Sequence, residues 1–183
     1  MIAGHLGIAG AAYSARRDSS LFWLLGASMA PDVVDALFVV ARLCNPYGLY
    51  SHTLPAAALI AAVTGAIAWL VTDRRVNGAL AAMLVLAHLP PDYLTGRKLF
   101  WPGGELLGLR LYEYPLADFV VEALIVVVGW WLVRSRRPAP RWATGWPALL
   151  ALLAVQGALD VAGARGGGTK PTACASASPL ATE

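Results

Sequence analysis

Long uncharged stretches constrain this chain most, because a segment without charge must be buried in a protein core or in lipid. Residues 55–72 contain no charged side chain, and three further stretches have only one or two polar interruptions each: 76–91, 115–133 and 146–163. Apolar runs of about 18 residues or more are typical of membrane spans, and runs near 14 of buried or partial spans. The sequence therefore predicts an all-α fold, an integral membrane helical bundle with about four spans.

The composition agrees with a membrane protein. The 183 residues are 58% hydrophobic and only 14% charged, whereas a soluble domain carries roughly a quarter charged residues. We expect residues 1–163 to form one membrane-embedded domain, in which two short N-terminal helices, about 3–16 and 21–30, precede the spans. The Gly/Ser/Ala-rich tail, 164–183, is expected to be disordered.

Two prolines follow Leu89, and the residue before a proline is disfavoured in the helical region. We therefore expect the helix of about 77–89 to end there and residues 93–114 to form a long loop. The two cysteines, Cys44 and Cys174, lack the spacing of a metal or redox motif and are expected to be free thiols. The net charge of +3 comes from basic residues in short loops, so membrane topology explains it and no nucleic-acid partner is expected.

Acidic side chains enter the apolar segments, whereas basic ones do not. Six of the eleven acidic residues lie inside or at the edge of such a segment: Asp32, Asp35, Asp92, Asp118, Glu122 and Asp160. Of the fourteen Lys and Arg residues, only Arg42 is comparable. Because long basic side chains reach the interface more easily than a short aspartate, the opposite bias would be expected. Buried acids without buried bases predict a bound metal ion.

The polar residues also fall at one end of the predicted bundle. If the helices alternate in direction, the following residues share that end: His5, Asp32, His52, His88, Asp92, Asp118 and Glu122. All three histidines of the chain are among them. The opposite end holds most of the arginines. This distribution favours one site over scattered polar groups.

Imidazoles and carboxylates are zinc ligands, at about 2.0–2.2 Å. Three histidines with Asp32 and Asp92 suffice for one zinc ion with an open position. Asp118 and Glu122, four residues apart on a predicted helix, face the same way and would complete the shell of a second ion. We thus expect a divalent metal cofactor, zinc before other metals, in one or two ions. A bound metal lowers the pKa of its water from about 15.7 toward about 7, which points to hydrolysis.

Other interpretations remain open for single residues. His5 fits an interfacial histidine, and His52 fits a helix cap. His88 and Asp92 fit a hydrogen-bonded pair without an ion, and Asp160 fits a group that bonds two helices together. The whole set also fits an ion- or proton-conducting path in a small transporter, or a non-catalytic membrane scaffold; a path would spread polar residues through the membrane depth.

Four short motifs together resemble the YdjM-like family, inner-membrane proteins assigned by inference as metal-dependent hydrolases. They are the N-terminal His5, the GASMAPDVVD segment, Ser51-His52-Thr53, and His88-x-x-x-Asp92 followed by T-G and W-P. The resemblance implies that the metal positions are His5, Asp32, His52, His88 and Asp92. It also implies that Asp35 is the second aspartate of the family's P-D-x-x-D motif.

A more distant likeness is to zinc-dependent phospholipase C and the P1-type nucleases. These all-helical enzymes bind zinc through a His, an Asp, a His and an H-x-x-x-D pair in that order, with a later H-x-x-x-E pair. Here the later pair is Asp118-x-x-x-Glu122. The missing histidine favours one or two ions over a three-zinc site.

The favoured function is a membrane-bound, metal-dependent hydrolase of phosphoester or related ester bonds. Its partners are the lipid bilayer and a small-molecule or lipid ester substrate. Asp35 or Glu122 is expected to shuttle the proton, while Arg97 and Lys98 either grip a phosphate or anchor the chain at the interface. Since arginines gather opposite the site, the protein is expected to be a multi-pass protein of the bacterial inner membrane whose site faces the periplasm.

Overall fold

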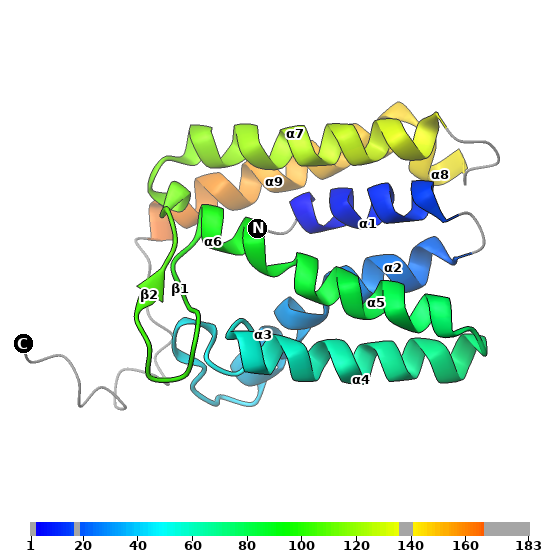
Figure 1. Ribbon diagram of the computed structural model, residues 1–183. Coiled ribbons are helices and arrows are strands. Elements are labelled where there is room, and N and C mark those ends of the chain that lie inside the picture. Colours follow the sequence, from blue (N-terminus) through cyan, green and yellow to red (C-terminus); the bar gives the residue numbers. More distant parts are fainter. Residues whose placement is uncertain (1–2, 17–18, 136–140, 167–183) are drawn as a thin grey trace, which may run out of the picture.

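The computed structural model describes residues 3–16, 19–135 and 141–166 as a bundle of helices packed side by side (Figure 1). The longer helices are, in chain order, α1 (Ala3–Ala15), α2 (Leu21–Ser28), α3 (Ala30–Val40), α4 (Leu54–Thr72), α5 (Arg75–Ala87), α7 (Pro115–Arg134) and α9 (Trp146–Gly166). The short elements are η1 (Pro46–Gly48), α6 (Leu89–Thr95), β1 (Lys98–Leu99), β2 (Leu106–Leu107), η2 (Leu111–Glu113) and α8 (Arg141–Thr144). The predicted all-α class is confirmed.

Two long apolar runs of the sequence form the helices α4 and α7. Each has a proline in its first turn, Pro55 in α4 and Pro115 in α7, where a missing N–H leaves no hydrogen bond unmade. Large apolar side chains such as Leu70 and Leu116 are 77% exposed on them. Exposed apolar faces on helices of this length are those of membrane spans.

Two helices, α4 and α7, are long and apolar enough to cross a membrane, and the pair α2 and α3, bent by 56°, would make a third span if it crosses as one. The predicted four spans are therefore not confirmed. The reason is length. Helix α5 has 13 residues, fewer than a span needs.

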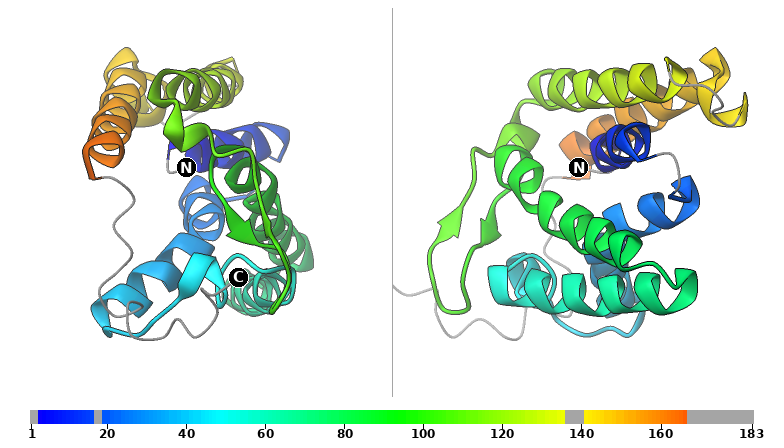
Figure 2. Two further views of the ribbon diagram at one scale, coloured as in Figure 1. Left: turned by 90° about the vertical axis from the view of Figure 1, so that its left-hand side faces the viewer. Right: turned by 45° about the vertical axis from the view of Figure 1, so that its right-hand side comes forward.

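Neighbouring helices pack in a continuous series: α4 on α5, α5 on α2, α2 on α1, α1 on α7 and α7 on α9 (Figure 2). Chain direction alternates between α4 and α5 and between α1 and α2 (Figure 1). As a result, the starts of α1, α4 and α7 and the end of α5 lie at one end of the bundle, on the left of Figure 1, with α6 and the β1–β2 hairpin. We call this the hairpin end.

The segment after His88 is more ordered than predicted. Leu89 is the first residue of helix α6, and the expected loop contains the antiparallel pair of β1 and β2. The prediction was wrong because Pro90 and Pro91 occupy the first turn of α6, where the backbone N–H has no intrahelical partner to lose. His88 and Asp92 consequently stay one helical turn apart.

Two other predictions concern the cysteines and the tail. Cys44 is disulfide-bonded, so the expected free thiol was wrong. Cys174 lies outside the described residues. The predicted tail begins at residue 164, but α9 continues to Gly166, and residues 167–183 lie outside the described part of the chain.

Helices α1 and α7 cross at two glycines. A Cβ atom on Gly129 would lie 2.1 Å from the carbonyl oxygen of Gly7, and one on Gly7 would lie 2.5 Å from that of Ile125. Both distances are far below van der Waals contact, so only glycine permits this approach. The crossing holds the start of α1, with His5, against the middle of α7.

Replacing Gly129 with alanine should therefore destabilise the protein. We expect a loss of about 1–3 kcal/mol, typical of an overpacked interior, and a lower midpoint of thermal unfolding in detergent. The matched control is Gly26→Ala, because a Cβ atom at Gly26 in α2 meets nothing within 4 Å. A Gly129→Ala protein as stable as the Gly26→Ala protein would contradict the tight crossing.

Candidate metal centre

Helices from distant parts of the chain deliver five polar side chains to the hairpin end. His5 lies on α1, Asp32 in the first turn of α3, and His52 just before Thr53, the N-cap of α4; His88 and Asp92 flank the start of α6. Each histidine is at most 1% exposed and Asp92 is 2% exposed, while the side chain of Asp32 is 27% exposed. The cluster is thus buried except on the side of Asp32.

The carboxylate of Asp92 contacts all three imidazoles. Its Oδ1 lies 3.0 Å from His5 Nε2, and its Oδ2 lies 2.7 Å from His52 Nε2 and 3.4 Å from His88 Nε2. Burial alone would raise the pKa of Asp92, but hydrogen bonds with the three rings outweigh it and hold that pKa well below its usual range. Asp92 is therefore an anion at the centre of the cluster.

The proton on His88 is located by a backbone carbonyl. His88 Nδ1 lies 2.8 Å from the carbonyl oxygen of Ser28, which can only accept, so Nδ1 carries a hydrogen. In the neutral ring, Nε2 then presents a lone pair. It faces Asp92 and lies 3.6 Å from Asp32 Oδ1 and 3.2 Å from His52 Nε2.

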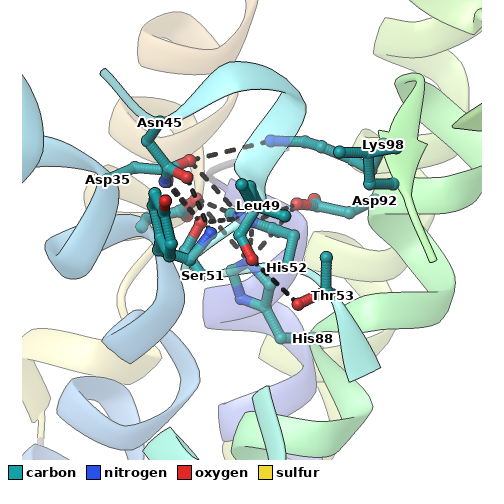
Figure 3. A network of polar contacts seen from close by, with 12 residues as sticks. Asp35, Asn45, Leu49, Ser51, His52, Thr53, His88, Asp92 and Lys98 are labelled. Atoms are coloured by element: carbon teal, nitrogen blue, oxygen red, sulfur yellow. Dashed lines mark hydrogen bonds and ion pairs between the residues drawn. The ribbon is translucent and has the colours of Figure 1, made fainter. Parts of the chain in front are cut away.

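The proton on His52 follows from a chain of hydrogen bonds (Figure 3). The Ser51 hydroxyl donates to the Asp35 carboxylate, which can only accept. Ser51 Oγ must then accept from His52 Nδ1, at 2.7 Å. Asn45 Nδ2 donates both to Asp35 and to Ser51 Oγ, the latter at 3.0 Å, and fixes this arrangement. The Nε2 of neutral His52 therefore also turns a lone pair inward.

When both rings are neutral, two lone pairs and two carboxylates thus face one point. One ligand atom each from Asp32, His52, His88 and Asp92 lies within 4.8 Å of the other three. Asp32 Oδ2 is buried without a hydrogen-bond partner in the described structure. Such a set of acceptors repels itself unless a positive charge lies between them. Two nitrogen and two oxygen donors fit a divalent first-row metal such as zinc.

The same demand for positive charge is visible in His88. Burial lowers the pKa of its imidazole, but hydrogen bonds to Asp32 and Asp92 outweigh this effect and raise the pKa to about 9. A proton and a metal ion would compete for the same lone pair, since only the unprotonated Nε2 can bind a metal. We call Asp32, His52, His88 and Asp92 the histidine–aspartate centre.

Residues 1–163 match the family described as the YdjM inner membrane protein. The chain belongs to the YdjM family. The match confirms the predicted family and, with the apolar helices, the predicted inner-membrane localisation. No curated protein and no solved structure matches the chain.

The remaining predicted site residues of this YdjM protein surround the centre or lie apart from it. His5 binds Asp92 and stacks on His88, with ring centroids 3.5 Å apart, and is outside the set of four ligand atoms. Asp35 lies behind His52, where its Oδ2 is 3.4 Å from His52 Nδ1 and 3.7 Å from Lys98 Nζ. Asp118 and Glu122 form a second group with Asp160.

Three groups that position the centre were not predicted. They are Asn45, the hydroxyl of Ser51 and the carbonyl of Ser28. Ser51 belongs to the quoted Ser-His-Thr motif, and its place beside His52 was a usable signal. No sequence pattern pointed to Asn45 or Ser28, because their contacts depend on how α2, α3 and α4 pack together.

Removing two of the four ligands should abolish metal binding at the centre. We expect wild-type protein, stripped with a chelator and given one equivalent of zinc, to retain about one zinc ion, and the His88→Ala, Asp92→Ala double variant to retain almost none. Elemental analysis of detergent-purified protein measures this. The control is Glu113→Gln, an exposed carboxylate paired with Arg110. Equal zinc in the wild type and the double variant would contradict a metal site here.

Removing the Ser51 hydroxyl should weaken metal binding without removing a ligand. Ser51→Ala leaves His52 Nδ1 without its acceptor, and loss of such an outer hydrogen bond lowers metal affinity by about 10–100-fold. Competition with a chromogenic chelator gives the affinity. Ser14→Ala is the matched control, because Ser14 is also buried but bonds the carbonyl of Ala11 in α1. Unchanged affinity in Ser51→Ala would show that the serine does not orient His52.

Proposed function

We propose that this YdjM-family protein is a metal-dependent hydrolase of phosphoester or related ester bonds, with membrane lipids as the substrate class. One observation carries the proposal: two imidazole nitrogens and two carboxylates converge at one end of a membrane bundle. A scaffold that binds no metal would not need buried acceptors that converge on a common point.

The residues have separate roles in this proposal. Asp32, His52, His88 and Asp92 would hold a divalent cation, zinc first, while His5 fixes Asp92 through its 3.0 Å contact. The bound cation would acidify a water molecule and draw charge from the phosphoryl or carbonyl oxygen of the substrate. The buried histidines keep bulk water away from the centre.

Asp35 is the favoured proton acceptor. Its Oδ1 accepts hydrogen bonds from Asn45 and Ser51, and the side chain is 31% exposed beside the centre. Glu122, the other predicted shuttle, is fully buried in the second carboxylate group, so we assign it no proton transfer. Lys98, whose side chain is 20% exposed, pairs with Asp35 and is placed to attract a phosphate.

The exposed fractions indicate the side of approach. The side chains of Asp32 and Asp35 are 27% and 31% exposed, whereas those of His52 and His88 are fully buried. A substrate would therefore enter from the side of α3 and β1. A lipid whose ester lies at the membrane boundary suits this approach, because its apolar chains can remain in the bilayer.

We further propose that the hairpin end faces the periplasm. Arginines lie at the opposite end, at Arg74 and Arg75 between α4 and α5 and at Arg134 and Arg141 after α7. Arginine-rich loops favour the cytoplasmic side. The disulfide-bonded Cys44, in the connection from α3 to α4, suits an oxidising compartment.

A conducting path is the alternative from another class. Within the described residues, the buried ionisable side chains are His5, His52, His88, Asp92, Asp118 and Glu122, and all of them except Glu122, which lies about two turns inside α7, are near the start or end of an element. Conduction would need such groups through the depth of the bilayer. Their confinement favours a site over a path.

The test is hydrolysis in lipid nanodiscs that contain the purified full chain. We expect release of a phosphorylated or acyl product from a defined phospholipid, seen by mass spectrometry, that stops with a chelator and returns with zinc. The His88→Ala, Asp92→Ala variant should lose at least about 1,000-fold in rate, the order of a lost metal catalyst.

The control variant, Glu113→Gln, should keep the wild-type rate, since Glu113 is exposed and pairs with Arg110. Zinc binding without hydrolysis of any phospholipid or acyl ester in the panel would sink the enzyme proposal. Zinc-dependent ion flux into sealed liposomes would favour the conducting path instead.

A further inference from the structure

A second group of acidic side chains lies where α7 and α9 meet at the hairpin end. Asp118 and Glu122 lie one turn apart on α7, and Asp160 lies on α9. One carboxylate oxygen of each is within 4.8 Å of the other two. Asp118 is 1% exposed and Glu122 is fully buried.

Each of the three carboxylates has a buried oxygen that no described group bonds. These are Asp118 Oδ1, Glu122 Oε1 and Asp160 Oδ2. The other oxygens are partly used: Glu122 Oε2 accepts from the backbone N–H of Gly4 at 3.3 Å, and Asp160 Oδ1 accepts from Gln156 Nε2 at 2.6 Å. Two of these unbonded oxygens thus belong to fully buried side chains, Asp118 and Glu122, and the third to the half-buried Asp160.

Among the described residues, no Lys or Arg side chain forms an ion pair with these three carboxylates. Lys98 pairs with Asp35, and Arg110 pairs with Glu113. Three carboxylates at such separations cannot all remain ionised in a buried site without a compensating charge. One shared proton can bridge only two of them, and the positively charged N-terminus adds a single further charge nearby. A divalent cation, whose ligand oxygens lie about 2.0–2.6 Å from it, can contact all three.

We propose that Asp118, Glu122 and Asp160 form a second cation site, selective for a hard divalent ion such as Mg²⁺, Mn²⁺ or Ca²⁺. Its donors are all oxygen, the ligand type that these ions prefer over the imidazoles that zinc favours. The site shares no ligand with the histidine–aspartate centre. The inference therefore does not depend on the proposed hydrolase.

The surrounding groups hold the three carboxylates in place. Gln156 donates to Asp160 and accepts from the backbone N–H of Ala3 at 3.3 Å, so one side chain ties α9 to the start of α1. The next residue, Gly4, ties α1 to Glu122 on α7. A site fixed by three helices in this way is preorganised for a ligand, since little ordering remains to be done on binding.

The test is Mn²⁺ binding, followed by electron paramagnetic resonance, to the full chain in nanodiscs after chelator treatment and addition of one equivalent of zinc. We expect about one Mn²⁺ per chain in the wild type, with Mg²⁺ or Ca²⁺ as competitors. Asp160→Asn and Glu122→Gln should each weaken Mn²⁺ binding at least tenfold, while Glu113→Gln should not. Asp160→Glu, which keeps a carboxylate, should retain part of the affinity.

A second measurement separates the two sites. The His88→Ala, Asp92→Ala variant should lose zinc but keep Mn²⁺, whereas Asp160→Asn should keep zinc and lose Mn²⁺. Zinc retention in Asp160→Asn also shows that this variant is folded. Equal Mn²⁺ binding by wild type and Asp160→Asn, or none by the wild type at millimolar Mn²⁺, would overturn the proposal. An infrared band of protonated carboxyl that Asp160→Asn removes and Mn²⁺ does not alter would show a shared proton only.

Discussion

The contact of the Asp92 carboxylate with three imidazoles joins parts of the chain that are far apart in sequence. His5 comes from the first turn of α1, His52 from the start of α4, and His88 from the end of α5. None of these elements could shift without breaking a contact of a buried anion, which is costly when no water replaces it. The glycine crossing of α1 and α7 and the proline start of α6 both serve this convergence. The packing of the helices and the geometry of the candidate metal centre therefore depend on the same contacts.

A comparison of the free energies shows that the centre needs a bound positive charge. In the neutral rings of His52 and His88, the protons lie on Nδ1, so only His5 can donate to Asp92. A hydrogen bond to a charged group contributes about 1.5–3 kcal/mol. A buried carboxylate costs several kcal/mol, and here Asp32 adds a second negative charge at 3.6–3.7 Å from the same ring nitrogens. One donor cannot offset that cost, so a proton or a metal ion must supply the rest.

The sequence predicted the helices well because apolar runs of this length have few other stable forms in a membrane protein. It also predicted which residues share an end, since alternating helices put the starts of some beside the ends of others. It did not predict that Asp118 and Glu122 would turn away from the histidines. That direction depends on the packing of α7 between α1 and α9, which no local pattern encodes. Helix α6 was not predicted because a proline pair breaks a helix when it lies inside it but is favourable in its first turn. The four predicted spans are not confirmed, because hydropathy measures apolar length along the chain and does not show where a helix ends.

The start of α1 lies between two groups of acids and touches both. Gly4 donates its N–H to Glu122, and the next residue, His5, contacts Asp92. The two groups together hold five carboxylates: Asp32, Asp92, Asp118, Glu122 and Asp160. One divalent ion offsets two of these five negative charges, and the positively charged N-terminus offsets one more. Since Lys98 pairs with Asp35, this end of the bundle stays negative with a single ion. Charge balance therefore favours two cations. Because Gly4 contacts one group of acids and His5 the other, the two ions would lie on different sides of the start of α1. The histidines and the α7–α9 carboxylates then need not share one ion.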